Sequence, residues 1–276
     1  MIEITTSCRV RAVDFDQQWL RDRAQEMCLD VSPVSNGLGV VSTKRMHRKV
    51  WEFAAIAQVY HEKFAGFSTK SLGFGCGLEP LPAWLANQHS RVIATDAPHD
   101  NAGWSDSNQR SSGLNDLPWM GICRSDYFAD NVNFHQVDMN NIPDDLLRGQ
   151  FDFTWSCGSF EHIGGIDASL SFFCQQMKAL KPGGIAAHTT EFNPRDTDRT
   201  LNEPNLCLFR ARDLRRLDEM LHAQGDRLWT LDLEPGETET DKVIDYPPYK
   251  GDVHLSIDVG GWTTTSVLLV AERGER

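Results

Sequence analysis

A glycine-rich turn is the feature of this 276-residue chain that points most directly to ligand chemistry. Gly73, Gly75 and Gly77 follow the apolar residues of a predicted strand. Without Cβ atoms, the backbone there can turn sharply and approach a ligand closely. Asp96 closes the next predicted strand, where a carboxylate can accept hydrogen bonds from both hydroxyls of a ribose. Together the turn and the acid indicate a site for a nucleoside cofactor.

Two nucleoside cofactors fit this geometry. A dinucleotide site requires the spacing GxGxxG, whose third glycine packs under the pyrophosphate. Here Gly77 is followed by Leu78, Glu79 and Pro80, and the Glu79 carboxylate would repel a pyrophosphate. S-adenosylmethionine has no phosphate and carries a sulfonium and an amino group, so acidic residues near the turn favour it. The turn therefore favours S-adenosylmethionine over a nicotinamide dinucleotide.

Four titratable residues follow or close two later predicted strands: Glu161, His162, His188 and Glu191. His162 is the candidate general base, because an imidazole pKa of about 6.5 suits proton abstraction near neutral pH. Alternatively, the four form a mixed oxygen and nitrogen set for a divalent metal. His188 and Glu191 have opposite parity on a strand, so both point inward only if that strand bends. A third interpretation is that Glu161 and His162 only shape a turn.

Alternating strands and helices must position these residues. Strands are predicted at residues 70–74, 91–95, 132–137, 151–155 and 185–190, with further candidates at 228–233, 253–257 and 264–271. Helices are predicted at residues 80–88, 167–180 and 212–223. This alternation is typical of an α/β fold with a parallel sheet, whose ligands bind at the carboxyl ends of the strands.

Residues 1–66 are predicted to form a helical cap, and residues 67–276 the cofactor-binding domain, as one structural unit. The cap contains predicted helices at 16–28 and 44–64, joined by a turn-rich link at 30–39. The second helix begins with four basic residues, which we interpret as a solvated face rather than a phosphate site: Lys44, Arg45, Arg48 and Lys49. Insertions at 97–131 and 192–210 are either walls of the ligand site or surface decoration.

The stretch from residue 70 to 191 resembles the class I S-adenosylmethionine-dependent methyltransferases. Five segments carry the resemblance: Leu72–Gly77, Ala94–Asp96, Gln136–Met139 followed by Ile142 and Pro143, Phe151–Ser156, and Leu180–Gly184. The family implies a Rossmann-like, mostly parallel sheet of seven strands, with one antiparallel strand near its edge. In this chain the sheet would carry the helical N-terminal segment and an insertion after its second strand.

The resemblance also implies which residues hold the cofactor: Gly73, Phe74, Gly75, Gly77, Glu79, Asp96, Asp138, Met139 and Ser156. The glycines would approach the methionine part, Asp96 the ribose, and Asp138 the adenine amino group. The chain departs from the family at Gly73, where an acid is usual, and at Glu79, where a glycine is usual. Metal-dependent members have an acid where Gly158 stands.

The resemblance implies a methyltransferase, and we predict O-methylation of a small-molecule or sugar hydroxyl in natural-product or glycan biosynthesis. One alternative is an N-methyltransferase acting on an amino sugar or a related small molecule. Another is a metal-assisted O-methyltransferase, and a third is a regulatory protein that binds the cofactor without turnover. Carboxylates at Glu79, Asp96, Asp138, Glu161 and Glu191 would make the ligand edge acidic and disfavour a heavily phosphorylated acceptor.

Composition narrows the partners and the compartment. With 27 Lys and Arg against 39 Asp and Glu, the net charge is −12, which argues against nucleic acid and anionic membranes as partners. No apolar run is long enough to span a bilayer, and the first residues lack the pattern of a secretory signal. Seven scattered cysteines without a CxxC pair predict reduced thiols in the cytoplasm. The sequence leaves a homo-oligomer open.

Other chemistry-bearing residues receive weaker interpretations. Asp245–Tyr249 is expected to be a rigid loop rather than the similar motif of amine-methylating enzymes. Arginines at one helix start are expected on a solvated face: Arg210, Arg212, Arg215 and Arg216. Aromatic residues of the first insertion either line an acceptor pocket or pack on the core: Trp104, Trp119 and Phe128. His135 is expected in the core.

Overall fold

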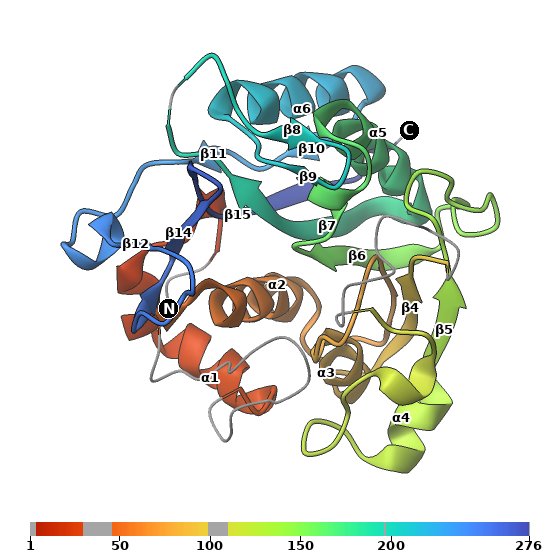
Figure 1. Ribbon diagram of the computed structural model, residues 1–276. Coiled ribbons are helices and arrows are strands. Elements are labelled where there is room, and N and C mark those ends of the chain that lie inside the picture. Colours follow the sequence, from red (N-terminus) through yellow and green to blue (C-terminus); the bar gives the residue numbers. More distant parts are fainter. Residues whose placement is uncertain (1–3, 30–45, 99–109, 196, 276) are drawn as a thin grey trace.

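The computed structural model describes residues 4–29, 46–98, 110–195 and 197–275 (Figure 1). At its centre, six strands lie in the order β5-β4-β3-β6-β7-β15. Their bounds are β3 (Thr69–Gly73), β4 (Ser90–Asp96), β5 (Val132–Gln136), β6 (Phe151–Cys157), β7 (Leu180–Phe192) and β15 (Trp262–Glu272). The first five are parallel to their neighbours, and β15 is antiparallel to β7. The predicted mostly parallel Rossmann-like sheet and its antiparallel strand are confirmed.

The far edge of the sheet contains a strand that the sequence did not predict. Strand β1 (Ser7–Arg9) pairs with β15 on one side and with β11 (Leu231–Asp232) on the other. The strand predicted at 228–233 is two short pieces, because β10 (Arg227–Leu228) pairs with β15, whereas β11 pairs with β1. Three residues are too few to show an alternating pattern, which is why β1 was missed. The N-terminal segment thus contributes to the same sheet, and its description as a separate cap stays a prediction.

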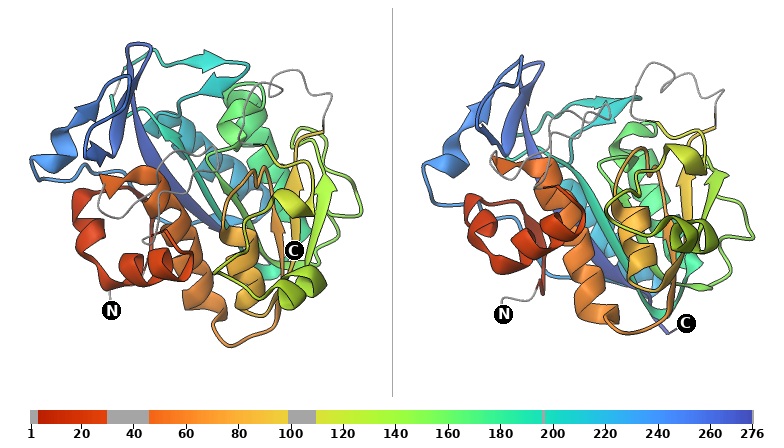
Figure 2. Two further views of the ribbon diagram at one scale, coloured as in Figure 1. Left: turned by 60° about the horizontal axis from the view of Figure 1, so that its bottom comes forward. Right: turned by 90° about the horizontal axis from the view of Figure 1, so that it is seen from below.

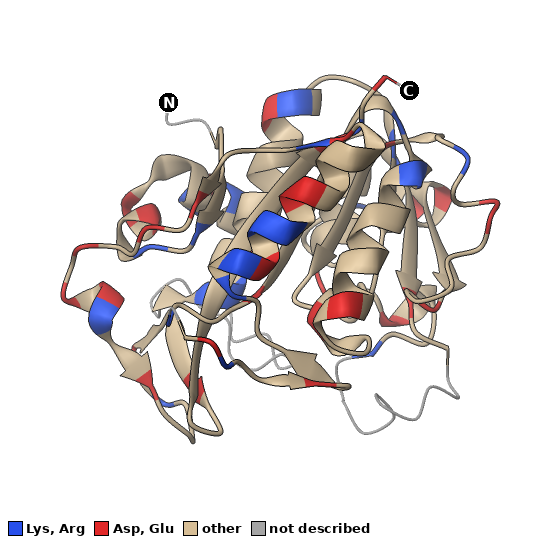
Figure 3. Ribbon diagram, turned by 90° about the horizontal axis from the view of Figure 1, so that it is seen from above, with Lys and Arg blue, Asp and Glu red and all other residues tan. Residues whose placement is uncertain are grey.

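Helices cover both faces of the sheet (Figures 1 and 2). One face packs against α2 (Arg48–Phe64) and α3 (Leu81–Asn87), and α1 (Gln18–Glu26) packs on the outer side of α2. The other packs against α5 (Ile166–Gln176) and α6 (Ala211–Gln224). A further helix, α4 (Ser125–Asn131), contacts α3 and β5. Basic and acidic residues alternate along α6, whose outer face is solvated (Figure 3).

Helix α2 lies between the N-terminal helix α1 and the sheet, which explains its composition. All its residues from Val50 to Tyr60 are buried, and it contacts β6, β7 and β15. Its N-terminal end is held by β2 (Met46–His47), which pairs with β13 (Val253–His254) from the C-terminal part of the chain. The position of the start of α2 is therefore set by this strand pairing. The pairing also fixes where the first side chains of α2 point.

Short elements complete the fold. The strands are β8 (Asn202–Glu203), β9 (Leu206–Cys207), β12 (Ile244–Asp245) and β14 (Ser256–Val259). The 3-10 helices are η1 (Ala12–Asp16), η2 (Leu114–Asp116), η3 (Phe160–His162), η4 (Met177–Ala179) and η5 (Thr240–Lys242). The predicted link at 30–39 and Trp104 lie outside the described residues. Within the part of the chain that the structure describes, no helix has the length and apolarity needed to cross a bilayer.

Candidate active site

A cavity of about 310 Å³ opens at the carboxyl edge of the parallel strands. It is lined by the segments that follow β3, β4, β5 and β6, by the start of α2 and by the β8–β9 turn. Among the predicted site residues, the cavity wall includes Gly75, Gly77, Glu79, Asp96, Asp138, Met139 and His162. The sheet topology brings these together because the carboxyl ends of neighbouring parallel strands meet at one edge.

The glycine turn forms one side of this cavity. Gly75 and Gly77 have φ values of 59° and 51°, in the left-handed region that favours glycine. A Cβ on Gly75 would lie 2.8 Å from the Cβ of Ser159 on the segment after β6, too close for any side chain. The turn therefore brings its bare backbone to the cavity wall, as close approach of a ligand requires.

The structure explains why Gly73 and Glu79 depart from the family pattern. A Cβ at Gly73 would lie 2.2 Å from the indole of Trp155, so the ring occupies the space of a side chain there. The indole Nε1 of Trp155 donates a 2.6 Å hydrogen bond to Glu79 Oε1. Burial raises the pKa of Glu79 to about 8, so its carboxyl group is mostly protonated at neutral pH.

Asp96 is held firmly at the end of β4. Its carboxylate accepts hydrogen bonds from the backbone amides of Ala97 and Ser111, both at 2.8 Å, and of Gly77 at 3.2 Å. Burial raises the pKa of Asp96, and the three amides act in the opposite direction. Such a carboxylate is oriented before a ligand arrives, which fits a ribose-binding role.

Three predicted cofactor residues lie behind the cavity wall. Gly73 packs against Trp155, as described above, and Phe74 is buried with its ring 5.1 Å from that of Phe172. Ser156 shares a 2.7 Å hydrogen bond with Nδ1 of His188. These residues shape the site from beneath, while Gly75, Gly77 and Asp96 present atoms to it.

His162 lies in the cavity wall with a defined tautomer. Its Nδ1 is 2.7 Å from the carbonyl oxygen of Asn205. A carbonyl can only accept, so Nδ1 carries the proton and Nε2 the lone pair. Nε2 lies 3.9 Å from Oε1 of Glu161. Burial lowers the pKa of His162, so the ring is neutral at neutral pH and can accept a proton.

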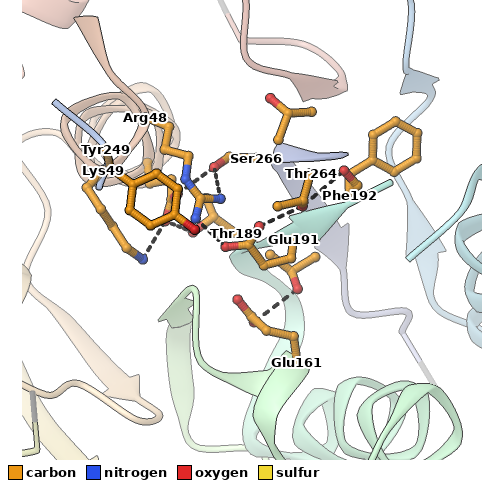
Figure 4. A network of polar contacts seen from close by, with 12 residues as sticks. Arg48, Lys49, Glu161, Thr189, Glu191, Phe192, Tyr249, Thr264 and Ser266 are labelled. Carbon is orange, nitrogen blue, oxygen red and sulfur yellow. Dashed lines mark hydrogen bonds and ion pairs between the residues drawn. The ribbon is translucent and has the colours of Figure 1, made fainter. Parts of the chain in front are cut away.

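A buried ionic cluster lies beside the cavity, between the start of α2 and the carboxyl ends of β6 and β7 (Figure 4). Arg48 pairs with Glu191 at 2.5 Å, and Lys49 pairs with Glu52 at 2.8 Å. Burial would raise the pKa of Glu52, but Lys49 and Arg48 outweigh it and lower that pKa to about 2. The prediction of a solvated face is therefore wrong for Arg48 and Lys49. The other two basic residues, Lys44 and Arg45, lie outside the described residues. Side-chain hydroxyls of Thr189, Thr264 and Ser266 donate to the carboxylates.

Lys49 occupies the space that a side chain at position 158 would need. Gly158 has φ of 59°, and a Cβ there would lie 2.3 Å from Nζ of Lys49. Both residues line the cavity. The ammonium of Lys49 thus occupies the place of the acidic side chain that the metal-assisted alternative would require.

The structure brings Glu161 close to His162 and Glu191, whereas His188 lies apart from these three residues. His188 is surrounded by aromatic rings, with Phe173 at 4.8 Å, and burial lowers its pKa to about 3. Glu191 instead pairs with Arg48 on α2. Burial, and next the nearby Glu191, raise the pKa of Glu161 to about 8. Within the described ranges, no group of three or more His, Cys, Asp or Glu residues has the arrangement of a metal site.

Sequence reasoning missed several residues of the cavity wall: Lys49, Phe53, Arg110, Asn140, Pro204 and Asn205. The basic start of the second helix was visible in the sequence. Its direction was not, because it depends on the pairing of β2 with β13, more than 200 residues apart. Asn205 acts through its backbone carbonyl, which no sequence motif reports.

The weaker interpretations have mixed outcomes. The arginines of α6 are solvated or paired, with Arg210 bound to Asp213 at 2.7 Å. Trp119 stacks on the buried Phe128 at 6.3 Å, so these two aromatic residues pack on the core. His135 is exposed on the edge strand β5, so its prediction as a core residue is wrong.

Residues 72–188 match a family model described as "Methyltransferase domain". The matched range starts in β3 and ends in β7, and so includes the glycine turn, Asp96 and His162. The family match, the sheet order and the cavity agree, and residues 72–188 form a methyltransferase domain. The prediction of a cofactor-binding protein without catalysis is set aside. No protein in the curated collection matched the chain.

Solved structures with a similar fold are distant in sequence. One is the 1,6-didemethyltoxoflavin-N1-methyltransferase of Burkholderia thailandensis, with S-adenosylhomocysteine bound (16% identity, 80% of this chain and 77% of that chain, TM-score 0.49). Another is the magnesium protoporphyrin IX methyltransferase of Synechocystis (11% identity, 82% and 83%, TM-score 0.45). A third is phosphoethanolamine N-methyltransferase 2 of Haemonchus contortus (16% identity, 80% and 51%, TM-score 0.47). Likenesses this distant carry no argument about the acceptor.

Proposed function

We propose that this methyltransferase acts on a hydroxyl group of a small-molecule or glycan acceptor, with His162 as the general base. One observation carries the proposal: a neutral imidazole lies in the wall of the cavity, with Nδ1 bound to a backbone carbonyl. That hydrogen bond assigns the lone pair to Nε2, the atom that would accept a hydroxyl proton.

The other residues of the cavity have separate proposed roles in binding the cofactor and aligning the reaction. S-adenosylmethionine supplies, when bound, a methyl group activated by its sulfonium. Asp96 would hold the ribose, Asp138 and Met139 the adenine, and the bare backbone of Gly75 and Gly77 would face the methionine part. The protein's contribution to in-line transfer is then alignment and exclusion of water, while His162 removes the proton.

A metal-assisted reaction is not part of the proposal. Lys49 takes the space beside Gly158, and His188 is enclosed by aromatic rings on α5. We expect dialysis against a chelator to leave methyl transfer unchanged. Elemental analysis that finds a stoichiometric metal, with activity lost on its removal, would contradict this.

The base assignment is tested by replacing His162 with Gln. We expect His162→Gln to keep affinity for S-adenosylhomocysteine within about threefold and to lose roughly 100-fold or more in turnover. The matched control is His135→Gln, since His135 is an exposed histidine on β5 and is not part of the cavity wall. Turnover of His162→Gln within a few-fold of the wild type would refute the assignment. NMR of the methylated product distinguishes an oxygen-bound from a nitrogen-bound methyl group.

We also propose a cytoplasmic protein acting in natural-product or glycan biosynthesis, without nucleic acid or membrane partners. The net charge of −12 and the free cysteines of the described residues support this part of the proposal. Fractionation of the source cells, with the protein recovered in the soluble cytoplasmic fraction, is the corresponding test.

A further inference from the structure

The charges of the cavity wall are unevenly distributed. Its three acidic residues, Glu79, Asp96 and Asp138, belong to the segments proposed to hold the cofactor. The remainder of the wall, formed by α2, the segment after β6 and the β8–β9 turn, has one cation, Lys49. In the described residues it has no carboxylate, because Glu52 and Glu161 are not part of the cavity wall. The expectation of an acidic cleft is therefore wrong for this half.

Lys49 is fixed in place. Its Nζ donates to Glu52 Oε2 at 2.8 Å and to the carbonyl oxygen of Cys157 at 3.3 Å. Burial lowers its pKa, but Cys157 and Glu52 outweigh this and keep the pKa above its ordinary value. An ammonium has three N–H groups. Two have oxygen acceptors among the described residues, and the third contact is a weak one to Sγ of Cys157 at 3.9 Å, which an anionic acceptor in the cavity can replace.

The ionic cluster balances the charge of Lys49 from behind, but among the described residues Lys49 is the only member of the cluster in the cavity wall. Arg48 is neutralised by Glu191, and both lie away from the cavity wall. Glu52 neutralises Lys49 from behind, with its carboxylate also bound by the hydroxyl of Ser266 at 2.5 Å. Gly158 is what lets the ammonium reach the wall, because any side chain there would displace it.

We propose that the acceptor carries an anionic group, such as a carboxylate, next to its methylated hydroxyl, and that Lys49 binds this group. The inference rests on the proposed function, which places the acceptor in this half of the cavity. A positive sulfonium and the Lys49 ammonium both attract an anion and repel a protonated amine. The same charges disfavour the alternative of N-methylation on a cationic amino sugar.

The test uses matched pairs of probes that differ in charge. The 2-, 3- and 4-hydroxybenzoates and the corresponding hydroxybenzamides are titrated calorimetrically into the complex with S-adenosylhomocysteine. We expect the wild type to bind at least one hydroxybenzoate roughly tenfold more tightly than its amide, the scale of one charge-assisted hydrogen bond. Lys49→Met should remove this preference, and Lys49→Arg should retain part of it. Lys70→Met, at an exposed lysine of β3, should leave it unchanged.

A double variant keeps the test valid if Lys49→Met alone does not fold. Lys49→Met leaves Glu52 without its ammonium partner, whereas Lys49→Met with Glu52→Gln removes both charges. Equal affinity for benzoates and benzamides in the wild type, no binding of any benzoate, or a preference that survives in both Lys49 variants would overturn the inference. If the preference is found but no probe is methylated with S-adenosylmethionine, the proposed hydroxyl transfer fails while the anion site stands.

Discussion

Replacing Gly158 with alanine tests whether the buried ammonium of Lys49 depends on the missing side chain. Gly158 has φ of 59°, and a left-handed backbone costs a residue with a Cβ about 1–2 kcal/mol. The new Cβ would also lie 2.3 Å from Nζ of Lys49 and 3.3 Å from Oε2 of Glu52. Lys49 must then leave Glu52 and the Cys157 carbonyl, at about 1.5–3 kcal/mol for a charged hydrogen bond. The expected total is about 2.5–5 kcal/mol.

The chain offers a matched control for the backbone contribution. Gly260, in the turn between β14 and β15, also has φ of 59°, but nothing lies within 4 Å of an added Cβ. Gly260→Ala should therefore cost only about 1–2 kcal/mol. Urea unfolding of both variants gives the two free energies of unfolding, and we expect them to differ by about 2 kcal/mol.

A double-mutant cycle links that difference to Lys49. In a Lys49→Ala background the ammonium is absent, so Gly158→Ala should cost about as much as Gly260→Ala. Equal costs of Gly158→Ala and Gly260→Ala in the wild-type background would refute the reasoning. An unchanged cost of Gly158→Ala in the Lys49→Ala background would do the same.

Two further predictions concern the cofactor half of the cavity. Asp96→Asn should weaken calorimetric binding of S-adenosylhomocysteine roughly tenfold or more, because the amide cannot accept two charged hydrogen bonds from the ribose; the exposed Asp130→Asn should bind normally, and equal affinities would remove Asp96 from the site. The native state holds a proton on Glu79, whose pKa is about 8, that the unfolded chain releases near its ordinary value of 4.5. Stability of the cofactor-free protein should therefore fall as the pH rises from about 5 to 8, with Glu79 contributing up to about 1.4 kcal/mol per pH unit. Urea unfolding of Glu79→Gln at pH 6, 7 and 8 should show a shallower fall, and an identical slope would contradict the assignment.

The fold was predictable because its central elements are long and strongly patterned. Strands β3, β4 and β6 and helix α5 were found near their observed positions, since each combines apolar periodicity with a clear turn. Strand β7 extends from Leu180 to Phe192, beyond the predicted 185–190, because Leu180 pairs with Phe151 of β6 and the pairing with β15 continues to Phe192. Tertiary pairing, which the local pattern does not encode, sets those ends.

The sequence allowed the positions of several residues proposed to hold the cofactor to be predicted at the cavity wall, but not the position of Lys49. Gly75, Gly77 and Asp96 are close in sequence to the strands that carry them, so topology alone places them at one edge. Lys49 reaches the cavity from a helix that precedes the sheet in sequence, and its burial depends on Gly158 and Glu52. A basic residue at a helix start is usually solvated, so only the packed structure reveals this one.

The central claim is that the cavity holds the methyl donor with its sulfur facing His162 and Lys49. A crystal structure of the complex with S-adenosylhomocysteine tests it most directly. We expect the ribose hydroxyls on Asp96 and the sulfur on the side of the cavity formed by His162, Lys49 and Gly158. A ligand bound outside this cavity, or one whose sulfur points away from His162 and Lys49, would contradict the claim.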